Sequence, residues 1–252
     1  MPIAADIRDE AERLTGAAMS ANLGLRLMGG LGVWLVSPSV RTPPFARDYG
    51  DLDFAVRRQD GRAVTSFLQE QGYLPERLFN SIHGAQRLNF SHPASLWTID
   101  VVIDALRMSH QIDLRGRLDP GPRTIDLADL LLTKLQVWEI NAKDLGDITC
   151  LLADFPISEG GGRTNGDAIG RSRILALTGR DWGLCHTLER NLRDVVAFAR
   201  ERRPAGSRFD PAAQAESLLM AIVAGPKSLA WRARGQIGER VRWYETPEEV
   251  RH

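Results

Sequence analysis

The stretch DYGDLDFAV (residues 48–56) decides the fold, because it places two carboxylates inside a segment that otherwise has the composition of a strand. Charged residues are depleted from strands. Side chains at positions i and i+2 of a strand point to the same face, so Asp51 and Asp53 would lie side by side and repel each other. A positive charge normally offsets such an arrangement, and a metal ion is the first candidate.

Two further segments have the pattern of strands, AQRLNFSH (85–92) and LWTIDVVIDAL (96–106), and we expect them to pair. In the second of them, Asp100 and Asp104 would share one face. If this strand lies near residues 51–56 in the sheet, three or four carboxylates meet, and such a cluster requires cations. Two Mg²⁺ ions about 4 Å apart would neutralise it and prepare in-line phosphoryl transfer.

A glycine pair precedes the two acids. The segment LRLM (25–28) predicts a short strand that runs into Gly29 and Gly30, and LGVWLV (31–36) predicts the start of a helix. Two glycines let the backbone approach a ligand closely, and the N-terminus of a helix offers free N–H groups to phosphate. Each feature has an ordinary alternative, a common turn for the glycines and an exposed edge strand for the acids.

The order of these blocks resembles the nucleotidyltransferase fold, the superfamily of DNA polymerase β. The spacer between Gly30 and Asp51 is similar in length to that of AbiEii-type proteins, which include toxin nucleotidyltransferases. The resemblance implies that Gly29 and Gly30 bind a nucleoside triphosphate (NTP), which is the substrate. It also implies that Asp51, Asp53 and one later acid bind two Mg²⁺ ions, or Mn²⁺. For the later acid we prefer Asp100, whose flanks are apolar, and Asp104 is the alternative.

A second block, IDLADLLLTKLQVWEINAKDLGDITCLL (125–152), adds a lysine to the candidate site. On a helical wheel Lys134 falls in the middle of an apolar stripe, where an amine needs an anionic partner, either a triphosphate or a carboxylate of the acid cluster. The alternative is a snorkelling lysine at a helix end. Asp144 and Asp147 follow at i and i+3 of the next helix. This pattern is similar to the later motifs of AbiEii-type proteins, which implies that Lys134 contacts phosphate and Asp144 supports the site, with Asp147 a weaker match.

Three other residues are weaker candidates. Arg87 lies on the strand before Asp100 and would reach a phosphate, although an exposed arginine on a strand is usually just solvated. His83 and His110 would serve as bases on the acceptor side, although isolated histidines are more often structural or exposed.

The composition of the chain limits the classes of function and location that it can have. The chain has 252 residues, and 32 Lys and Arg balance 32 Asp and Glu, so net charge does not favour bulk nucleic-acid binding. The two cysteines, Cys150 and Cys185, have no partner at metal-binding spacing. The N-terminal sequence lacks the apolar core of a signal peptide, and we find no segment that would span a membrane. We therefore expect a soluble, cytoplasmic protein.

Strand patterns gather early in the chain and helical patterns late, which predicts an α+β fold. We expect a small mixed sheet flanked by helices, the nucleotidyltransferase fold, followed by a helical C-terminal region. The Gly-rich segment PISEGGGRTNGDA (156–168) is the best candidate linker. The expected domains are therefore residues 1–155, which would be nucleotidyltransferase-like, and residues 156–252, which would be helical.

The leading hypothesis is an enzyme that moves a nucleoside monophosphate from an NTP to an acceptor hydroxyl. Asp51, Asp53 and Asp100 would hold the metal ions, and Lys134 with the amides of Gly29 and Gly30 would offset the triphosphate charge. The acceptor, by the resemblance, is a small molecule, a tRNA end or a protein. A catalytically inactive relative that binds nucleotides or a partner is the alternative, and an unrelated α+β protein with surface acids is the third reading.

Overall fold

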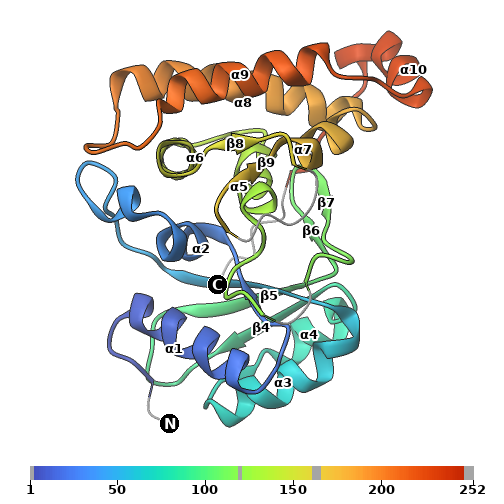
Figure 1. Ribbon diagram of the computed structural model, residues 1–252. Coiled ribbons are helices and arrows are strands. Elements are labelled where there is room, and N and C mark those ends of the chain that lie inside the picture. Colours follow the sequence, from blue (N-terminus) through green and yellow to red (C-terminus); the bar gives the residue numbers. More distant parts are fainter. Residues whose placement is uncertain (1–2, 119–120, 161–165, 247–252) are drawn as a thin grey trace. The chain divides into compact units, whose positions relative to one another are not determined.

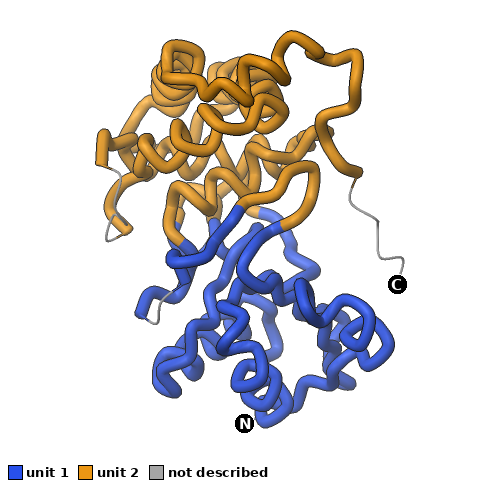
Figure 2. Tube along the Cα trace, turned by 90° about the vertical axis from the view of Figure 1, so that its right-hand side faces the viewer, with its two compact units in different colours: residues 1–36, 47–106, 113–125 blue, residues 37–46, 107–112, 126–252 orange. Residues whose placement is uncertain are grey.

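A computed structural model describes residues 3–118, 121–160 and 166–246 of the chain. These residues form two units, coloured in Figure 2: unit 1 consists of residues 1–36, 47–106 and 113–125, and unit 2 of residues 37–46, 107–112 and 126–252. The units do not divide at the expected boundary, because residues 126–155 pack with the C-terminal helices. Whether residues 1–155 fold as a domain by themselves stays a prediction. Part of the expected linker, residues 161–165, lies outside the described residues.

Unit 1 is built on a mixed sheet of five strands in the order β1-β2-β5-β4-β3, of which β4 and β5 are labelled in Figure 1. The strands are β1 (Arg26–Leu27), β2 (Asp51–Val56), β3 (Leu74–Pro75), β4 (Arg87–Ser91) and β5 (Thr98–Ile103). The central strands β2 and β5 are parallel, and the other neighbouring pairs are antiparallel. The prediction of an α+β fold with a small mixed sheet flanked by helices is confirmed.

The central strands alternate between an apolar and a polar face. The apolar face joins one hydrophobic cluster with the helices α1 (Ile7–Ser20) and α3 (Gly61–Glu70). Its members on the strands include Leu52, Phe54, Phe90, Ile99 and Val101. Asp51, Asp53 and Asp100 occupy the alternate positions of β2 and β5 and therefore point to the opposite face. The apolar residues thus fix the direction in which the carboxylates point, because a shift of one residue would expose the core.

Four helices and a short 3-10 segment accompany the sheet of unit 1. They are α1 (Ile7–Ser20), α2 (Gly29–Val36), η2 (Arg58–Asp60), α3 (Gly61–Glu70) and α4 (Arg77–His83). The sequence pattern did not predict α4, whose segment is short and leaves Leu78 and Ile82 exposed. A helix without an apolar stripe toward the core gives no periodic signal.

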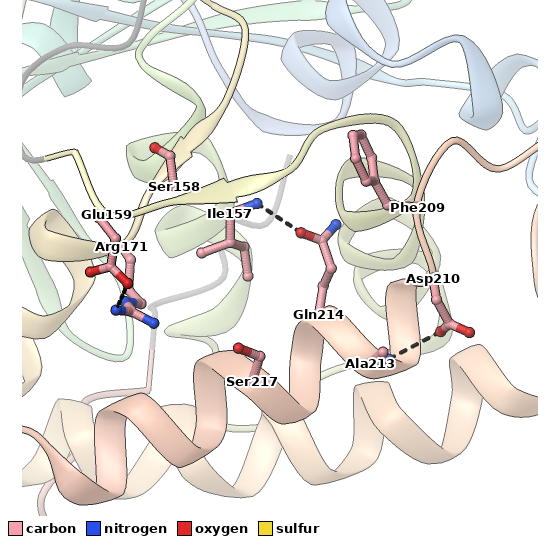
Figure 3. Close-up of a pocket in the computed structure, with 9 residues that line it drawn as sticks. All are labelled: Ile157, Ser158, Glu159, Arg171, Phe209, Asp210, Ala213, Gln214 and Ser217. Atoms are coloured by element: carbon pink, nitrogen blue, oxygen red, sulfur yellow. Dashed lines mark hydrogen bonds and ion pairs between the residues drawn. The ribbon is translucent and has the colours of Figure 1, made fainter.

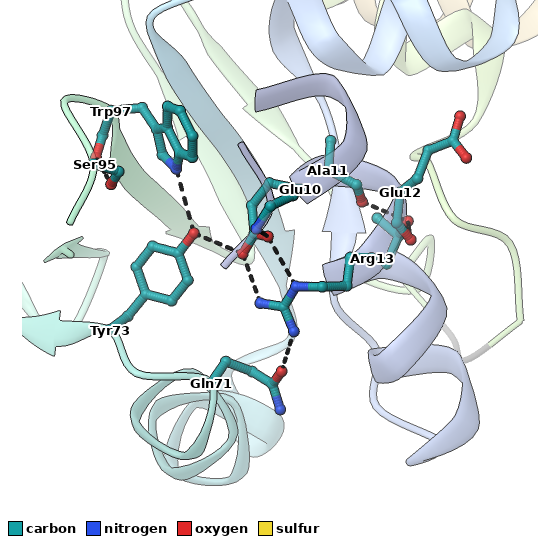
Figure 4. Close-up of polar contacts among 10 residues, drawn as sticks. Glu10, Ala11, Glu12, Arg13, Gln71, Tyr73, Ser95 and Trp97 are labelled. Atoms are coloured by element: carbon teal, nitrogen blue, oxygen red, sulfur yellow. Dashed lines mark hydrogen bonds and ion pairs between the residues drawn. The ribbon is translucent and has the colours of Figure 1, made fainter. Parts of the chain in front are cut away.

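A buried carboxylate ties α1 to the rest of unit 1 (Figure 4). Glu10 accepts hydrogen bonds from Arg13 Nε (2.8 Å) and Tyr73 Oη (2.9 Å), and Trp97 Nε1 donates to Tyr73 Oη (3.4 Å). Burial raises the pKa of Glu10, but the hydrogen bonds from Arg13, from the Ala4 backbone and from Tyr73 outweigh it and lower the pKa below its ordinary value. The charged form of Glu10 is therefore the one that stabilises the fold.

Unit 2 is mainly helical, and α8 and α9 run along each other (Figure 1). Its elements are η1 (Pro38–Arg41), α5 (Leu127–Leu135), α6 (Ala142–Asp154), β8 (Ile157–Ser158), β9 (Ile169–Gly170), α7 (Arg171–Thr178), α8 (Trp182–Glu201), α9 (Pro211–Ala224), α10 (Leu229–Ile237) and η3 (Gly238–Arg240). The short strands β6 (Ala105–Arg107) and β7 (Gln111–Asp113) form a two-stranded sheet. Of the helices in the described residues, none combines the length and the apolarity that crossing a membrane needs.

The helix that carries Lys134 is short: the sequence pattern of residues 126–141 favours one continuous helix, but α5 ends at Leu135. The side-chain amide of Asn191 on α8 donates hydrogen bonds to the carbonyls of Leu135 (2.8 Å) and Val137 (2.7 Å). Carbonyl groups at a helix end need such partners. A residue more than 50 positions away therefore satisfies the end of α5, and a local pattern does not reveal it.

We predict that Glu10→Gln destabilises the protein by about 2 kcal/mol at pH 7, since it weakens hydrogen bonds to a buried charge. The pKa of Glu10 is lowered in the folded state, so its contribution is present above its unfolded-state pKa of about 4.3 and is lost as the pH falls through the folded-state value. The difference from wild type, measured by urea unfolding, should therefore shrink in acid. Glu12→Gln, at an exposed position of the same helix, is the control and should change little. Equal effects of the two variants would contradict this role of Glu10.

Candidate functional site

The polar face of the sheet brings the predicted acids together in unit 1. In the parallel pairing of β2 and β5, Asp53 is the direct partner of Asp100, and Asp51 is the partner of Thr98. The hydroxyl of Thr98 donates to Asp51 Oδ1 at 3.1 Å. Partners in a pairing share a face, so the carboxylates of Asp53 and Asp100 are neighbours. The condition set for a cluster of carboxylates, that residues 96–106 lie near residues 51–56 in the sheet, is therefore met.

The first glycine of the pair makes room for Asp53. Gly29 begins α2 with a φ of +63°, and a Cβ at this position would overlap the carboxylate of Asp53. The preceding residue is fixed as well, because Met28 N–H donates to the carbonyl of Asp53 at 2.8 Å. Only glycine combines this conformation with this contact. The turn before α2 thus lies directly against the second acid of the D-x-D motif.

The second glycine lies against an arginine that the sequence reasoning missed. A Cβ at Gly30 would come within 2.6 Å of Arg47 Nη2, and the guanidinium of Arg47 stacks 4.3 Å from the ring centroid of Tyr49. Arg47 is therefore a cation beside the start of α2, where the first backbone N–H groups have no partner within the helix. The signal available in the sequence was a basic residue four positions before Asp51.

Asp100 is held by an arginine from the neighbouring strand. Arg87 Nε lies 2.7 Å from Oδ1 and 2.8 Å from Oδ2 of Asp100, and Arg87 Nη2 lies 2.7 Å from Oδ2. Burial raises the pKa of Asp100 above its ordinary value, the charge of Asp51 raises it further, and Arg87 opposes both. Burial lowers the pKa of Arg87, but its bonds to Asp100 and the charge of Asp53 outweigh this and raise it. Arg87 is thus a cation that directly offsets the charge of Asp100.

The alternative third acid, Asp104, lies just beyond β5 and has a different partner. It adopts a φ of +62°, and its carboxylate accepts the backbone N–H of Arg58 at 2.9 Å and lies 3.5 Å from Arg58 Nε. Asp100 rather than Asp104 is the register partner of Asp53. Within the described residues, no three His, Cys, Asp or Glu side chains are arranged to hold a metal ion. The donor chemistry of Asp51, Asp53 and Asp100 still suits a divalent cation, since all three supply carboxylate oxygens.

Lys134 finds its anionic partners inside unit 2. Its ammonium lies 2.8 Å from Asp144 Oδ1 and 3.0 Å from Asp147 Oδ2, and all three side chains are largely buried. Burial lowers the pKa of Lys134, but Asp147 and Asp144 outweigh it and raise the pKa above its ordinary value. The carboxylates that Lys134 contacts are those of Asp144 and Asp147, whereas the sequence analysis expected a triphosphate or a carboxylate of the acid cluster. The residues of this group belong to a different unit from Asp51, Asp53 and Asp100.

The two candidate histidines have structural contacts. His110 is buried, its Nε2 lies 2.8 Å from Thr187 Oγ1, and burial lowers its pKa. His83 ends α4, and its ring lies 4.7 Å from that of Phe79. Their proposed roles as bases on the acceptor side stay predictions.

Unit 2 also contains a cavity of about 270 Å³ beside α9 (Figure 3). The lining residues are Ile157, Ser158, Glu159, Arg171, Phe209, Asp210, Ala213, Gln214 and Ser217. Arg171 pairs with Glu159, Gln214 accepts the N–H of Ile157 at 2.7 Å, and Asp210 pairs with Arg203 outside the lining. The lining includes none of the predicted site residues, and its charged and amide groups already have partners within the protein.

Comparison with known proteins identifies no relative by sequence: no protein-family model and no curated protein matches the chain. Among solved structures, the chain is similar to an antigenic nucleotidyltransferase-like protein from Paracoccidioides brasiliensis. The TM-score is 0.40 at 14% sequence identity, over 91% of this chain and 98% of that one. A similarity of this size establishes neither family nor function, so the proposals below are argued from the residues of the chain itself.

We predict that Gly29→Ala destabilises the protein by about 1–2 kcal/mol or more, because alanine is strained at this φ and its Cβ displaces the Asp53 carboxylate. Gly50→Ala is the matched control, since Gly50 precedes the same strand and has open space around its Cβ position. Chemical unfolding should show a loss for Gly29→Ala and a change within about 0.5 kcal/mol for Gly50→Ala. Indistinguishable variants would show that the Gly29–Asp53 contact does not constrain the turn.

We further predict that Lys134→Met destabilises the protein by about 3–5 kcal/mol, because it leaves the carboxylates of Asp144 and Asp147 buried without their cation. Lys143→Met, at an exposed position near the start of α6, is the control and should have little effect. Urea unfolding at pH 7 measures both. A variant at residue 134 as stable as wild type would mean that the buried pairs contribute nothing net.

Proposed function

We propose that the protein is a metal-dependent nucleotidyltransferase, which moves a nucleoside monophosphate from an NTP to an acceptor hydroxyl and releases pyrophosphate. The observation that carries the proposal is the register of β2 and β5, which makes Asp53 and Asp100 neighbours directly beside a glycine turn that opens a helix. The order of the motifs along the chain supports it, since it resembles the nucleotidyltransferase superfamily.

Each candidate site residue has a separate role in this proposal. Asp51 and Asp53 would hold Mg²⁺ or Mn²⁺, with Asp100 as the third carboxylate, placed to accept the proton of the acceptor hydroxyl. A divalent metal would supply charge neutralisation and a template for the triphosphate. The N–H groups of Gly29 and Gly30 at the start of α2 would bind phosphate oxygens. Lys134 and Asp144 stay proposed members of the site, with Lys134 bound to Asp144 when no nucleotide is present.

The acceptor stays open among a small hydroxylated molecule, a tRNA end and a protein, and a toxin role in a toxin–antitoxin pair is a further expectation from the resemblance. One observation favours the alternative of an inactive nucleotide- or partner-binding protein. Arg87 already neutralises Asp100, and a carboxylate with an internal cation has no need of a metal. A transfer assay separates the two functions, because the inactive alternative allows nucleotide binding but no turnover.

We predict that the wild-type protein with Mg²⁺ transfers label from α-labelled NTPs to one fraction of a cell lysate and releases pyrophosphate. Asp53→Asn should reduce the rate by about 100-fold or more, because a metal-binding carboxylate contributes several kcal/mol to the transition state. Its fold should persist, since asparagine has the shape of aspartate. Asp48→Asn, an exposed acid five residues earlier, is the control and should retain the rate. Nucleotide binding without transfer by wild type, over all four NTPs, would favour the inactive alternative.

A further inference from the structure

The Arg87–Asp100 pair raises a question for the proposed function. Arg87 contacts both carboxylate oxygens of Asp100 at 2.7–2.8 Å. A planar guanidinium bound in this way occupies the lone pairs on the side of the carboxylate that faces it, so a metal ion on that side would have to displace it. A divalent cation beside Asp53 would also repel the guanidinium, whose charge already acts on Asp53. Metal binding and the present Arg87–Asp100 contact are therefore in competition.

The position of Arg87 allows its guanidinium to move away from the carboxylate of Asp100. Arg87 and Asp100 are not direct partners in the pairing of β4 and β5: Arg87 pairs with Val102, and Asn89 pairs with Asp100. The arginine therefore reaches Asp100 diagonally along the same face. Its side chain is 42% exposed, whereas that of Asp100 is 17% exposed. The guanidinium can thus move away from Asp100 by side-chain rotation, without opening the core on the other face of the sheet.

We propose that Arg87 is a resident counter-cation that exchanges partners when substrate binds. Without metal, it neutralises Asp100 and keeps the row of carboxylates stable. When a nucleoside triphosphate arrives with its divalent metal, Asp100 passes to the metal and Arg87 passes to a phosphate oxygen of the nucleotide. This proposal rests on the proposed function. It assigns Arg87 a positioning role in the metal-free protein and a substrate-binding role in the complex.

A consequence is that nucleotide and metal strengthen each other's binding. Metal alone has to separate Arg87 from Asp100, and the free energy of breaking this ion pair weakens metal binding. When the triphosphate is also present, Arg87 pairs with a phosphate oxygen, and this penalty on metal binding is offset. Such a coupling is reciprocal, and couplings of this kind typically change affinity about 5- to 150-fold.

The test is Mn²⁺ affinity, measured by electron paramagnetic resonance or calorimetry with and without a non-hydrolysable NTP analogue. We expect the analogue to tighten Mn²⁺ binding to the wild type about tenfold. In Arg87→Gln, Mn²⁺ alone should bind about tenfold tighter than to the wild type, and the analogue should add much less. Arg115→Gln is the matched control, because Arg115 makes the same kind of bidentate pair with Asp113 on an exposed surface. It should behave like the wild type.

A second variant changes the other member of the pair, Asp100, and tests the partner exchange even if Arg87→Gln does not fold. Asp100→Asn releases Arg87 from its anion, so the analogue should bind this variant without metal about fivefold tighter than it binds the wild type. Metal-free affinity that is unchanged or weaker would overturn the proposal.

The outcomes separate this inference from the proposed function. If wild type binds Mn²⁺ with the analogue, but Arg87→Gln binds Mn²⁺ alone no tighter than wild type does, Arg87 is only a structural partner of Asp100 and the exchange is wrong. If neither protein binds Mn²⁺ under any condition, the metal-dependent function itself fails, and the exchange fails with it.

Discussion

Asp53 and Asp100 are direct partners on neighbouring parallel strands, and the repulsion between their carboxylates constrains the polar face of unit 1. The apolar face of the same strands is packed against α1 and α3, so the acids cannot turn inward without exposing the core. They cannot spread apart either, because the pairing of β2 with β5 fixes their spacing. The remaining solution is a nearby cation, and in this structure the guanidinium of Arg87 provides it.

The same rule governs the buried charges of unit 2. Lys134 lies between Asp144 and Asp147, and Arg173 Nε lies 2.8 Å from the buried Asp129. A buried ion pair contributes little net stability, but removing one partner is costly. These pairs therefore join α5 to α6 and to α7 through contacts whose loss would be costly. In unit 1, by contrast, the arginine that offsets the acids is nearly half exposed, so its contact is the one that a ligand can replace.

The sequence predicted those features that rest on local pattern. The D-x-D strand and the class of fold followed from alternation along short segments. The pairing that puts Asp100 beside Asp53 was only a condition at that stage, and the structure supplied it. The features that were missed depend on contacts between distant residues. Asn191 bonds to a carbonyl at the end of α5, and the guanidinium of Arg87 bonds to Asp100. Neither contact can be predicted from the hydrophobic periodicity of a single segment. Likewise, the stripe around Lys134 showed that it needs an anion, but only the structure showed which one.

The most direct measurement of the central claim is anomalous diffraction from crystals of the protein grown with Mn²⁺ and a non-hydrolysable NTP analogue. If these carboxylates hold the metal, anomalous density should lie at coordination distance, about 2.0–2.2 Å, from carboxylate oxygens of Asp53 and Asp100. The guanidinium of Arg87 should also have left Asp100 for a phosphate oxygen. Bound nucleotide with no Mn²⁺ at these carboxylates, and with Arg87 still paired to Asp100, would contradict this claim.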